Sequence, residues 1–351
     1  MNVSDAGPDD DIRTDDVPRV SMAAIAQLAG VSVPTVSKVL NGRQGVAAAT
    51  RDHVRLILEK HHYIRRGSSG KRPTGLIDFV IRDLDPNWAM PLVRGAEDEA
   101  SKAGVSLVVT STHGRRIGNR HWVQHLASRR TDAVVLTVTD FQTGIAEELS
   151  KLNTPVVLVD PIGGTAPNIP AVAATNFEGA FAATEHLLNL GHRRIGIITG
   201  PNQVTCSRER MQGYRAAMSK AGVEADPRLE HWGDFLSDSG ALATRRMLSI
   251  PQPPTAIFAG SDQCAAGVYK EAHRHGLAIP RDLSVVGFDD VMIATWLQPE
   301  LTTVRQPLEE MAREAIRMAL QLAHGSHLTH PRRRLATHLV VRDSTAPPPE
   351  R

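Results

Sequence analysis

The stretch VSMAAIAQLAGVSVPTVSKVLN, residues 20–41, predicts two short amphipathic helices joined by a tight turn at Gly30-Val31-Ser32. Ser21 and Ser32 stand at the two helix starts, where a hydroxyl can accept a backbone N–H that the helix leaves unpaired. Pro34 falls in the first turn of the second helix, where its missing N–H removes no helical hydrogen bond. The stretch therefore predicts a helix-turn-helix.

Each of these helices is too short to be stable alone, so the unit needs a third helix. Residues 50–62 supply a candidate, with apolar residues and His61 on one face. The predicted core is made of Met22, Ile25, Ala26, Ala29, Val36, Val39, Leu40, Val54, Ile57 and Leu58. We therefore expect a three-helix headpiece over residues 19–64.

In a helix-turn-helix the second helix lies in the major groove of DNA. We expect Val33, Pro34 and Lys38 to face base edges, and Ser32, Thr35, Ser37 and Asn41 to face phosphates. The charge of this region agrees, because residues 19–72 carry a net charge of +8 while residues 1–18 carry −5. A basic block is expected where a protein meets a polyanion. This charge disfavours the alternative of a helical bundle that binds protein.

The rest of the 351-residue chain is long enough for a two-lobed body over residues 75–345, joined to the headpiece by a basic linker over residues 65–74. The acidic residues 1–18 and the ending APPPER, residues 346–351, are predicted to be disordered tails. No apolar run reaches the roughly 18 residues of a membrane helix, so we expect a cytoplasmic protein with no membrane partner. Cys206 and Cys264 lack CxxC spacing and are interpreted as free thiols.

The body alternates short apolar runs with longer amphipathic ones, which is typical of an α/β fold with doubly wound parallel sheets. For the first lobe we predict strands at 75–81, 105–110, 133–138 and 155–160, and helices at 89–103, 119–128 and 145–152. For the second lobe we predict strands at 171–175, 194–199, 229–233, 255–259 and 284–288, and helices at 177–189, 208–220, 240–248 and 264–275.

Ligands of open α/β sheets bind beyond the carboxyl ends of the strands. Polar and aromatic residues follow several predicted strands, namely Asp83, Trp88, Asp160, Arg208, Arg210, Phe235 and Asp262. Carboxylates and guanidinium groups bind vicinal hydroxyls, and an aromatic ring can cover the C–H side of a sugar. The pattern predicts a sugar pocket between the lobes. Asp289 and Asp290 also follow a strand, where either could bind the ligand or orient the next loop.

These segments together resemble the LacI/GalR family of sugar-responsive repressors. The resemblance rests on SMAAIAQLAGVSVPTVSKVLNG, ATRDHVRLILEKHHYI, SVVGFDD and LTTVRQP, and covers residues 20 to about 345. It implies a body like that of periplasmic binding proteins, a homodimer on a near-palindromic operator, and a small sugar as effector. By motif position it implies that Arg210 and Asp262 hold the effector's hydroxyls, with weaker matches at Trp88, Asp160, Phe235 and Gln306.

The chain departs from the family pattern in two places. RRGSSGKRPTG, residues 65–75, stands where the family usually has a hinge helix, and its glycines, serines and proline oppose a helix. Arg65, Arg66 and Arg72 could still lie along phosphates or enter a narrow minor groove. Ala47 stands where the family tends to cap its third helix with a side-chain oxygen.

Other chemistries have little support in the sequence. No GxxxxGK[ST] or GxGxxG run is present, so no ATP or NAD cofactor is predicted. His121 and His125 have a spacing that could bind zinc together with a third ligand, but we favour the interpretation that they lie on a solvated face of a helix. No metal is assigned to His324, His327 and His330 either. Cys206 is interpreted as a packed thiol. The chain is predicted not to be an enzyme; the rival hypotheses are a sugar-binding protein without DNA-dependent function and a sugar-modifying enzyme. The sequence names neither the sugar nor whether it induces or corepresses.

Overall fold

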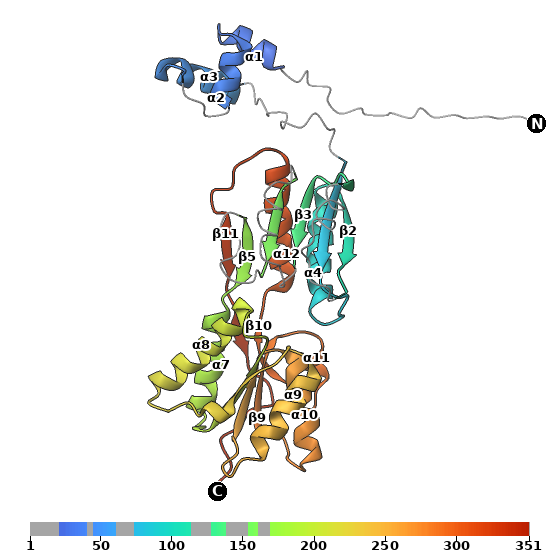
Figure 1. The fold of residues 1–351 in the computed structure, drawn as a ribbon, viewed down its shortest axis with the longest axis vertical. Helices are drawn as coiled ribbons and strands as arrows, with labels where there is room; N and C mark the ends of the chain where they lie inside the picture. Colours follow the sequence, from blue (N-terminus) through green and yellow to red (C-terminus); the bar gives the residue numbers. More distant parts are fainter. Residues whose placement is uncertain are drawn as a thin grey trace, which may run out of the picture. The chain divides into compact units, whose positions relative to one another are not determined.

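The computed structural model describes residues 21–40, 45–60, 74–113, 128–137, 154–160 and 169–350. The chain divides into two compact units, Met1–Ser68 and Ser69–Arg351, which we describe separately (Figure 1). The predicted contact residues Asn41, Arg65, Arg66 and Arg72 lie outside the described residues, as do His121 and His125, the predicted helix at 145–152 and all but the last residue of the predicted helix at 119–128.

The described part of the first unit contains three helices, α1 (Met22–Leu28), α2 (Val33–Leu40) and α3 (Ala48–Lys60). Both predicted N-caps are confirmed. The Ser21 hydroxyl accepts the Ala24 N–H at 3.1 Å, and the Ser32 hydroxyl accepts the Thr35 N–H at 3.3 Å. The buried core is formed by Ile25, Ala26, Ala29, Val36, Val39, Val54 and Leu58, as the apolar pattern predicted. Because all three helices contribute to it, none needs to be stable alone.

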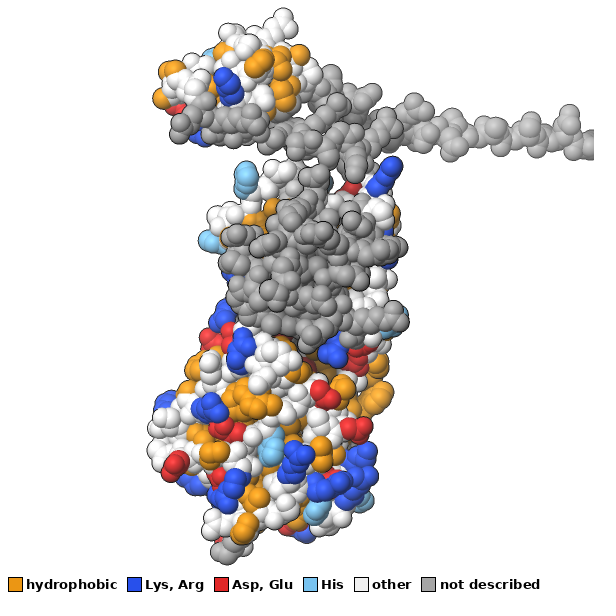
Figure 2. All heavy atoms as spheres, in the orientation of Figure 1, with side chains coloured by type: hydrophobic (Ala, Val, Ile, Leu, Met, Phe, Trp, Pro, Cys, Tyr) orange, Lys and Arg blue, Asp and Glu red, His pale blue; other side chains and the backbone are white. Residues whose placement is uncertain are grey.

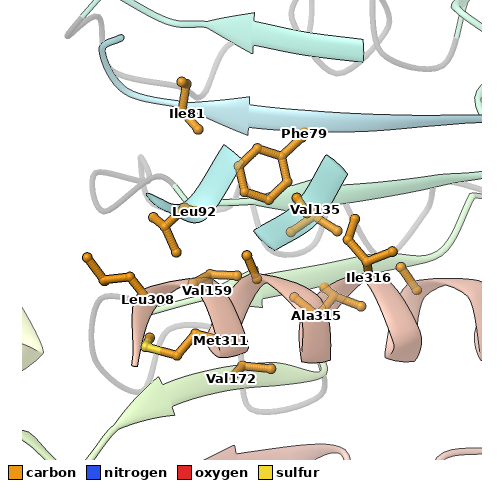
Figure 3. Close-up of a cluster of buried hydrophobic side chains, with 14 of the residues drawn as sticks. Phe79, Ile81, Leu92, Val135, Val159, Val172, Leu308, Met311, Ala315 and Ile316 are labelled. Carbon is orange, nitrogen blue, oxygen red and sulfur yellow. The ribbon is translucent and has the colours of Figure 1, made fainter. Parts of the chain in front are cut away.

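The first lobe of the second unit is built on a six-stranded sheet in which all paired neighbours are parallel, in the order β11-β5-β4-β3-β1-β2. Its strands are β1 (Leu76–Ile81), β2 (Ser106–Ser111), β3 (Ala133–Leu136), β4 (Val156–Val159), β5 (Ala171–Ala174) and β11 (Arg332–Leu335). Helices α4 (Ala89–Lys102) and α12 (Leu308–Ala323) share one core with the sheet. Figure 3 shows Leu92 and Ile316 of these helices with Phe79 and Val135 of the strands.

The second lobe has the strand order β12-β10-β9-β8-β6-β7. Its strands are β6 (Ile195–Thr199), β7 (Glu230–Trp232), β8 (Ala256–Ala259), β9 (Ser284–Asp289), β10 (Thr302–Arg305) and β12 (His338–Val340), of which β12 is antiparallel to β10. Helices α7 (Asn176–Asn189) and α8 (Thr205–Lys220) pack in one core, and α9 (Ser237–Leu248) and α10 (Asp262–Arg274) in another. The short elements are η1 (Pro227–Leu229) and α11 (Ile293–Trp296). Figure 2 shows acidic and basic side chains interspersed on the visible face of this lobe.

The chain passes between the lobes three times, and the prediction missed two of these passages. The strand predicted at 171–175 for the second lobe is wrong in its placement, because β5 pairs with β4 of the first sheet. After β10 the chain returns to the first lobe through α12 and β11, and then ends in the second lobe with β12. Thr337 and Thr175 join two of the passages, since the Thr337 N–H donates to the Thr175 hydroxyl at 2.8 Å.

The C-terminal segment is still hydrogen-bonded to the second lobe at residue 346, where the prediction placed the start of a disordered tail. The Ala346 N–H donates to the Ser284 hydroxyl at 3.0 Å, and the Ala346 carbonyl lies 2.9 Å from a ring nitrogen of His192. The prediction of a disordered tail that starts at residue 346 is therefore wrong at its first residue.

Among the described residues, no single helix is long and apolar enough to cross a membrane, although α1 and α2, bent by 102°, pass that test as a pair by length and composition. The same residues contain no group of three His, Cys, Asp or Glu side chains that could hold a metal ion. Cys206 and Cys264 are free and buried, and burial raises the pKa of both thiols, that of Cys264 to about 12. Both thiols are therefore protonated at neutral pH.

Candidate functional site

Helix α2 presents one apolar face to the headpiece core and a second face, which carries Lys38, to solvent. Val36 and Val39 are buried, whereas Val33, Pro34 and Lys38 are exposed. The Ser32 hydroxyl lies 2.8 Å from that of Thr35, so these two side chains form a small hydrogen-bonded group at the start of the helix. No acidic side chain occurs in α2. The exposed face therefore has the shape and charge expected of a helix that enters the major groove.

The second unit contains a buried arginine at the point where the strand ends of the two lobes meet. Arg210 of α8 is 3% exposed, and its Nε donates to Asn176 Oδ1 at 3.0 Å. Its Nη1 donates to the Gly260 carbonyl, and its Nη2 donates to Gln306 Oε1 at 3.2 Å. The guanidinium carbon lies 3.6 Å from the ring centroid of Phe288. These contacts fix the plane of the guanidinium, which is a requirement for directed recognition of hydroxyl groups.

Two carboxylates face this arginine from different lobes. Asp160 directly follows β4 and Asp289 ends β9, and both have positive φ angles, 51° and 109°. Asp289 Oδ1 lies 3.7 Å from Arg210 Nη2 and has no hydrogen-bond partner in the described structure. Burial raises the pKa of Asp289 to about 7, although Arg210 opposes the shift. Burial also raises the pKa of Asp160, while Arg210 and hydrogen bonds from Cys206 and Asn176 lower it.

Asp262 has a different role from the one that the resemblance implied. Its side chain is fully buried, and its Oδ2 accepts the Val291 N–H at 2.8 Å while its Oδ1 accepts the Thr303 hydroxyl at 2.5 Å. A Cβ at Gly287 would overlap Oδ1, so the backbone also closes around this carboxylate. In this structure the carboxylate supports the loop after β9, which argues against the expectation that Asp262 holds the effector's hydroxyls.

The two aspartates after β9 divide the roles that the sequence left open. Asp290 is paired with Arg305 and Arg342, with oxygen to nitrogen distances of 2.6 Å in both pairs. Asp290 thus orients the loop, whereas Asp289 keeps in the cluster an oxygen that has no hydrogen-bond partner in the described structure.

On the first lobe, Asp85 takes the place predicted for Asp83. The Asp83 side chain is 52% exposed and pairs with Arg82 at 3.4 Å. Asp85 Oδ2 accepts the Trp88 N–H at 3.1 Å, and both carboxylate oxygens lie 2.9 Å from Nε2 of Gln263 on the second lobe. Trp88 itself is half-buried against the first-lobe core. The carboxylate after β1 that contacts the second lobe is therefore Asp85 and not Asp83, the residue predicted for the sugar pocket.

Of the remaining predicted residues, Phe235 and Gln306 lie in the cluster and Arg208 does not. The Phe235 ring centroid is 5.3 Å from the Arg210 guanidinium carbon, and a Cβ at Gly200 would overlap the ring. Arg208 donates to the carbonyls of Asn202 and Gln203 at 3.1 and 2.6 Å, so it holds the loop before α8.

The prediction missed four residues of this region, namely Asp85, Asn176, Ser207 and Gln263. Asn176 begins α7 two residues after β5 ends, so its position near a strand end could have identified it had that strand been placed in the correct sheet. Ser207 lies one helical turn before Arg210, is fully buried, and has a hydroxyl with no hydrogen-bond partner in the described structure. No spacing rule would have singled out Ser207 or Gln263.

Known proteins match both units. Residues 21–66 match the model of bacterial regulatory proteins of the lacI family, and residues 184–345 match a periplasmic binding protein-like domain. The chain is 31% identical over 330 residues to the HTH-type transcriptional repressor CytR of Escherichia coli K12, covering 93% of this chain and 96% of that repressor. It is 33% identical to the ribose operon repressor of the same organism, covering 92% and 99%. The chain belongs to the LacI family.

Solved structures of LacI-family proteins agree with this assignment. A complex of the transcriptional regulator CelR with cellobiose is 32% identical, with a TM-score of 0.72, and the match covers 92% of this chain and 99% of that one. The lac repressor dimer bound to operator is 28% identical, with a TM-score of 0.70 and coverages of 93% and 99%. The predicted fold class and the resemblance to LacI repressors are confirmed, and the protein is a transcriptional regulator with a helix-turn-helix DNA-binding domain.

Proposed function

We propose that this LacI-family protein is a repressor that binds a near-palindromic operator as a homodimer and is controlled by a small sugar held between its lobes. The observation that carries the proposal is the buried Arg210, which forms an ion pair at 3.7 Å with an oxygen of Asp289 that has no hydrogen-bond partner in the described structure, with Asp160 of the other lobe close enough to affect both. A fixed guanidinium flanked by carboxylates is suited to a ligand rich in hydroxyl groups.

The DNA side of the proposal rests on α2. This helix exposes Val33, Pro34 and Lys38, and such a small set of side chains gives one headpiece little surface for specific recognition. Two headpieces related by a two-fold axis double the contacts and match a palindromic site. The lac repressor, a relative with the same fold, is a dimer in its operator complex.

The sugar side rests on the cluster that joins the lobes and on the relatives. One relative is named for the ribose operon, and another was solved with cellobiose. Both sugars are therefore starting probes for this protein. A sugar that binds Asp160 and Arg210 together would hold the lobes closed, and closure would change how the two headpieces fit the DNA.

The proposal includes no catalytic activity, since the relatives named above are repressors. It places the protein in the cytoplasm, where operator DNA is found. A sugar-binding protein without DNA-dependent function is disfavoured by the lacI-family match over residues 21–66. That alternative also leaves the exposed face of α2 without a role.

The experiment has two steps, both on the full chain. Selection from random duplex DNA, followed by fluorescence anisotropy, should yield a near-palindromic site bound at least a thousandfold more tightly than unrelated DNA. A thermal-shift screen of uncharged sugars should then find a ligand that raises Tm and alters operator affinity; at 100 times its Kd a ligand adds about 2.7 kcal/mol. Failure to enrich any DNA sequence would contradict the DNA-binding part, and a lack of response to every sugar would contradict the effector part.

A further inference from the structure

The headpiece and the segment that precedes it carry charges of opposite sign. Residues 1–18, which we call the acidic tail, contain six aspartates and one arginine, a net charge of −5, whereas residues 19–72 carry +8. The tail and the headpiece belong to the same compact unit. A run of carboxylates next to a basic DNA-binding region repeats the negative charge of the phosphates that such a region binds. The tail is therefore suited to compete with DNA for the same cations.

The described part of the headpiece exposes cations that have no anionic partner. The side chains of Lys38 in α2 and Arg55 in α3 are exposed, and neither forms an ion pair in the described structure. Among the headpiece residues whose side chains are described, Asp52 is the one acidic residue. These cations are available to DNA phosphates and equally to carboxylates from another part of the chain.

The acidic tail is long enough for its carboxylates to reach these cations. Its last aspartate, Asp16, precedes the α1 N-cap Ser21 by five residues, and Asp9 precedes it by twelve. Fully extended, five residues span about 17 Å and twelve residues span about 40 Å. The longest described helix of the headpiece, α3, has 13 residues and is therefore about 20 Å long. Every face of the headpiece lies within reach of tail carboxylates.

The covalent connection makes weak ion pairs effective. A single exposed ion pair contributes little, because water and salt screen it. A short flexible connection, however, holds the tail at an effective concentration on the order of millimolar beside the headpiece. Unrelated DNA is bound through its phosphates with a Kd of only about 10⁻⁴–10⁻⁶ M at physiological salt. Several tail carboxylates acting together can therefore compete with DNA phosphates without blocking a tightly bound operator.

From these charges we propose that the acidic tail occupies the exposed face of α2, which carries Lys38, and competes there with DNA for the headpiece of its own protomer. The proposal rests on the proposed DNA binding and adds an internal competitor to it. A tail that occupies each headpiece half of the time lowers the DNA affinity of a dimer about fourfold. The factor is the same for operator and unrelated DNA, because both must displace the tail. Salt weakens the tail contacts, so the tail also makes DNA affinity fall less steeply as salt rises.

The test compares the unmodified full-length protein with a neutral-tail variant and a matched control. The neutral-tail variant combines Asp5→Asn, Asp9→Asn, Asp10→Asn, Asp11→Asn, Asp15→Asn and Asp16→Asn. The control replaces the same six aspartates by glutamate, which keeps the charge. None of these positions lies in the headpiece core, so both variants should keep the fold. Anisotropy titrations with the selected operator and with unrelated duplex DNA at several salt concentrations provide the measurement.

At low salt the neutral-tail variant should bind both DNAs about fourfold or more tightly than the unmodified protein, because no tail has to be displaced. The difference should shrink as salt rises, and the glutamate control should bind like the unmodified protein. Equal affinities of the neutral-tail variant and the unmodified protein would overturn the proposal while leaving the proposed function intact. If neither protein binds DNA, the proposed function fails and this proposal fails with it.

A second measurement separates occupation of the headpiece from simple repulsion of DNA by the tail. Carbodiimide treatment of the unmodified protein without DNA should join a tail carboxylate to the Lys38 amine within one chain, as mapped by mass spectrometry. Excess unrelated DNA should suppress this crosslink. If the neutral-tail variant binds DNA more tightly but the crosslink is absent from the unmodified protein, the tail only repels DNA and the proposed contact is wrong. A crosslink found only between two chains would overturn occupation by the protomer's own tail.

Discussion

Gln263 of the second lobe donates from its Nε2 toward both carboxylate oxygens of Asp85 on the first lobe, at 2.9 Å each. The two residues follow β8 and β1, so the contact ties together the strand ends at which the lobes face each other. It therefore stabilises the arrangement in which Arg210, Asp160 and Asp289 are close, and contributes indirectly to a site that needs both lobes.

The first prediction concerns this contact. Gln263→Leu keeps the side-chain volume but leaves Asp85 without its partner from the other lobe. A hydrogen bond to a charged group contributes about 1.5–3 kcal/mol, so sugar affinity should fall roughly tenfold or more. Calorimetry with the sugar found by screening provides the measurement. The control is Gln252→Leu, at an exposed glutamine, and this variant should bind the sugar with the affinity of the unmodified protein. If Gln263→Leu also binds the sugar with unchanged affinity, the contact between Gln263 and Asp85 is not needed for sugar binding.

The second prediction distinguishes a side chain that recognises operator bases from one that binds phosphates of any DNA sequence. Lys38→Ala should reduce affinity for the selected operator more than for unrelated DNA, because Lys38 is exposed on the α2 face that should meet base edges. Arg72→Ala, in the linker, should weaken both alike and lower the salt slope by up to about one unit. Anisotropy titrations at several salt concentrations would measure this. Equal losses on both DNAs for Lys38→Ala would reassign Lys38 to a phosphate.

The third prediction contrasts Arg210 with Asp262. Arg210→Lys keeps the charge but loses the planar fork that bonds Asn176 and Gln306, so sugar affinity should fall at least tenfold. Asp262→Ala should instead destabilise the fold, because it leaves the Val291 N–H without its buried acceptor, a loss of about 1–3 kcal/mol.

Asp262→Asn is the matched control for this contrast. Its amide can still accept the Val291 N–H, and the Thr303 hydroxyl can rotate to accept from its NH₂ group. This variant should keep sugar affinity within about threefold, since both hydrogen bonds of the side chain within the second lobe can be kept. Denaturant unfolding and calorimetry measure the two effects. Loss of sugar binding in a stable Asp262→Asn variant would restore Asp262 as a ligand contact.

The fourth prediction concerns pH. The pKa of Asp289 rises from 3.8 to about 7 on folding, mainly through burial. Between those values the folded state binds more protons than the unfolded state, so this residue makes stability fall as pH rises toward 7 and level off above it. Asp289→Asn removes that contribution, at about 1.4 kcal/mol per pKa unit. The free energy of unfolding should decline less between pH 5 and 8 in the variant; an identical slope would show that Asp289 does not titrate there.

Local sequence patterns predicted most helices and strands well, because the spacing of apolar residues and the helix N-caps depend on residues that are close together in the sequence. The Ser21 and Ser32 caps and the alternation of strands and helices were correct for that reason. The placement of β5 was wrong, and α12, β10, β11 and β12 were not predicted, because assignment to a lobe depends on pairing between strands far apart in sequence, such as β11 with β5. A strand such as Arg332–Leu335, rich in arginine, also lacks the apolar signal of a buried strand.

The sequence also predicted part of the site, because the position of a residue at a strand end is a local property. Polar and aromatic residues at strand ends indicated one region with Asp160, Arg210, Phe235 and Asp289, and the family resemblance added Gln306. The pattern could not distinguish Asp262 from Asp289, because the difference lies in which N–H and hydroxyl groups fold back onto each carboxylate. It also could not choose between Asp83 and Asp85, since that depends on how the chain turns after β1.

The most direct test of the account is operator affinity of the full-length protein measured by anisotropy with and without the screened sugar, for the unmodified chain and for Arg210→Lys. The account predicts that saturating sugar changes operator affinity of the unmodified protein at least tenfold, and that Arg210→Lys binds the operator equally well but responds only at much higher sugar concentration. A variant whose operator affinity responds to sugar as the unmodified protein does would contradict the claim that the cluster around Arg210 receives the effector.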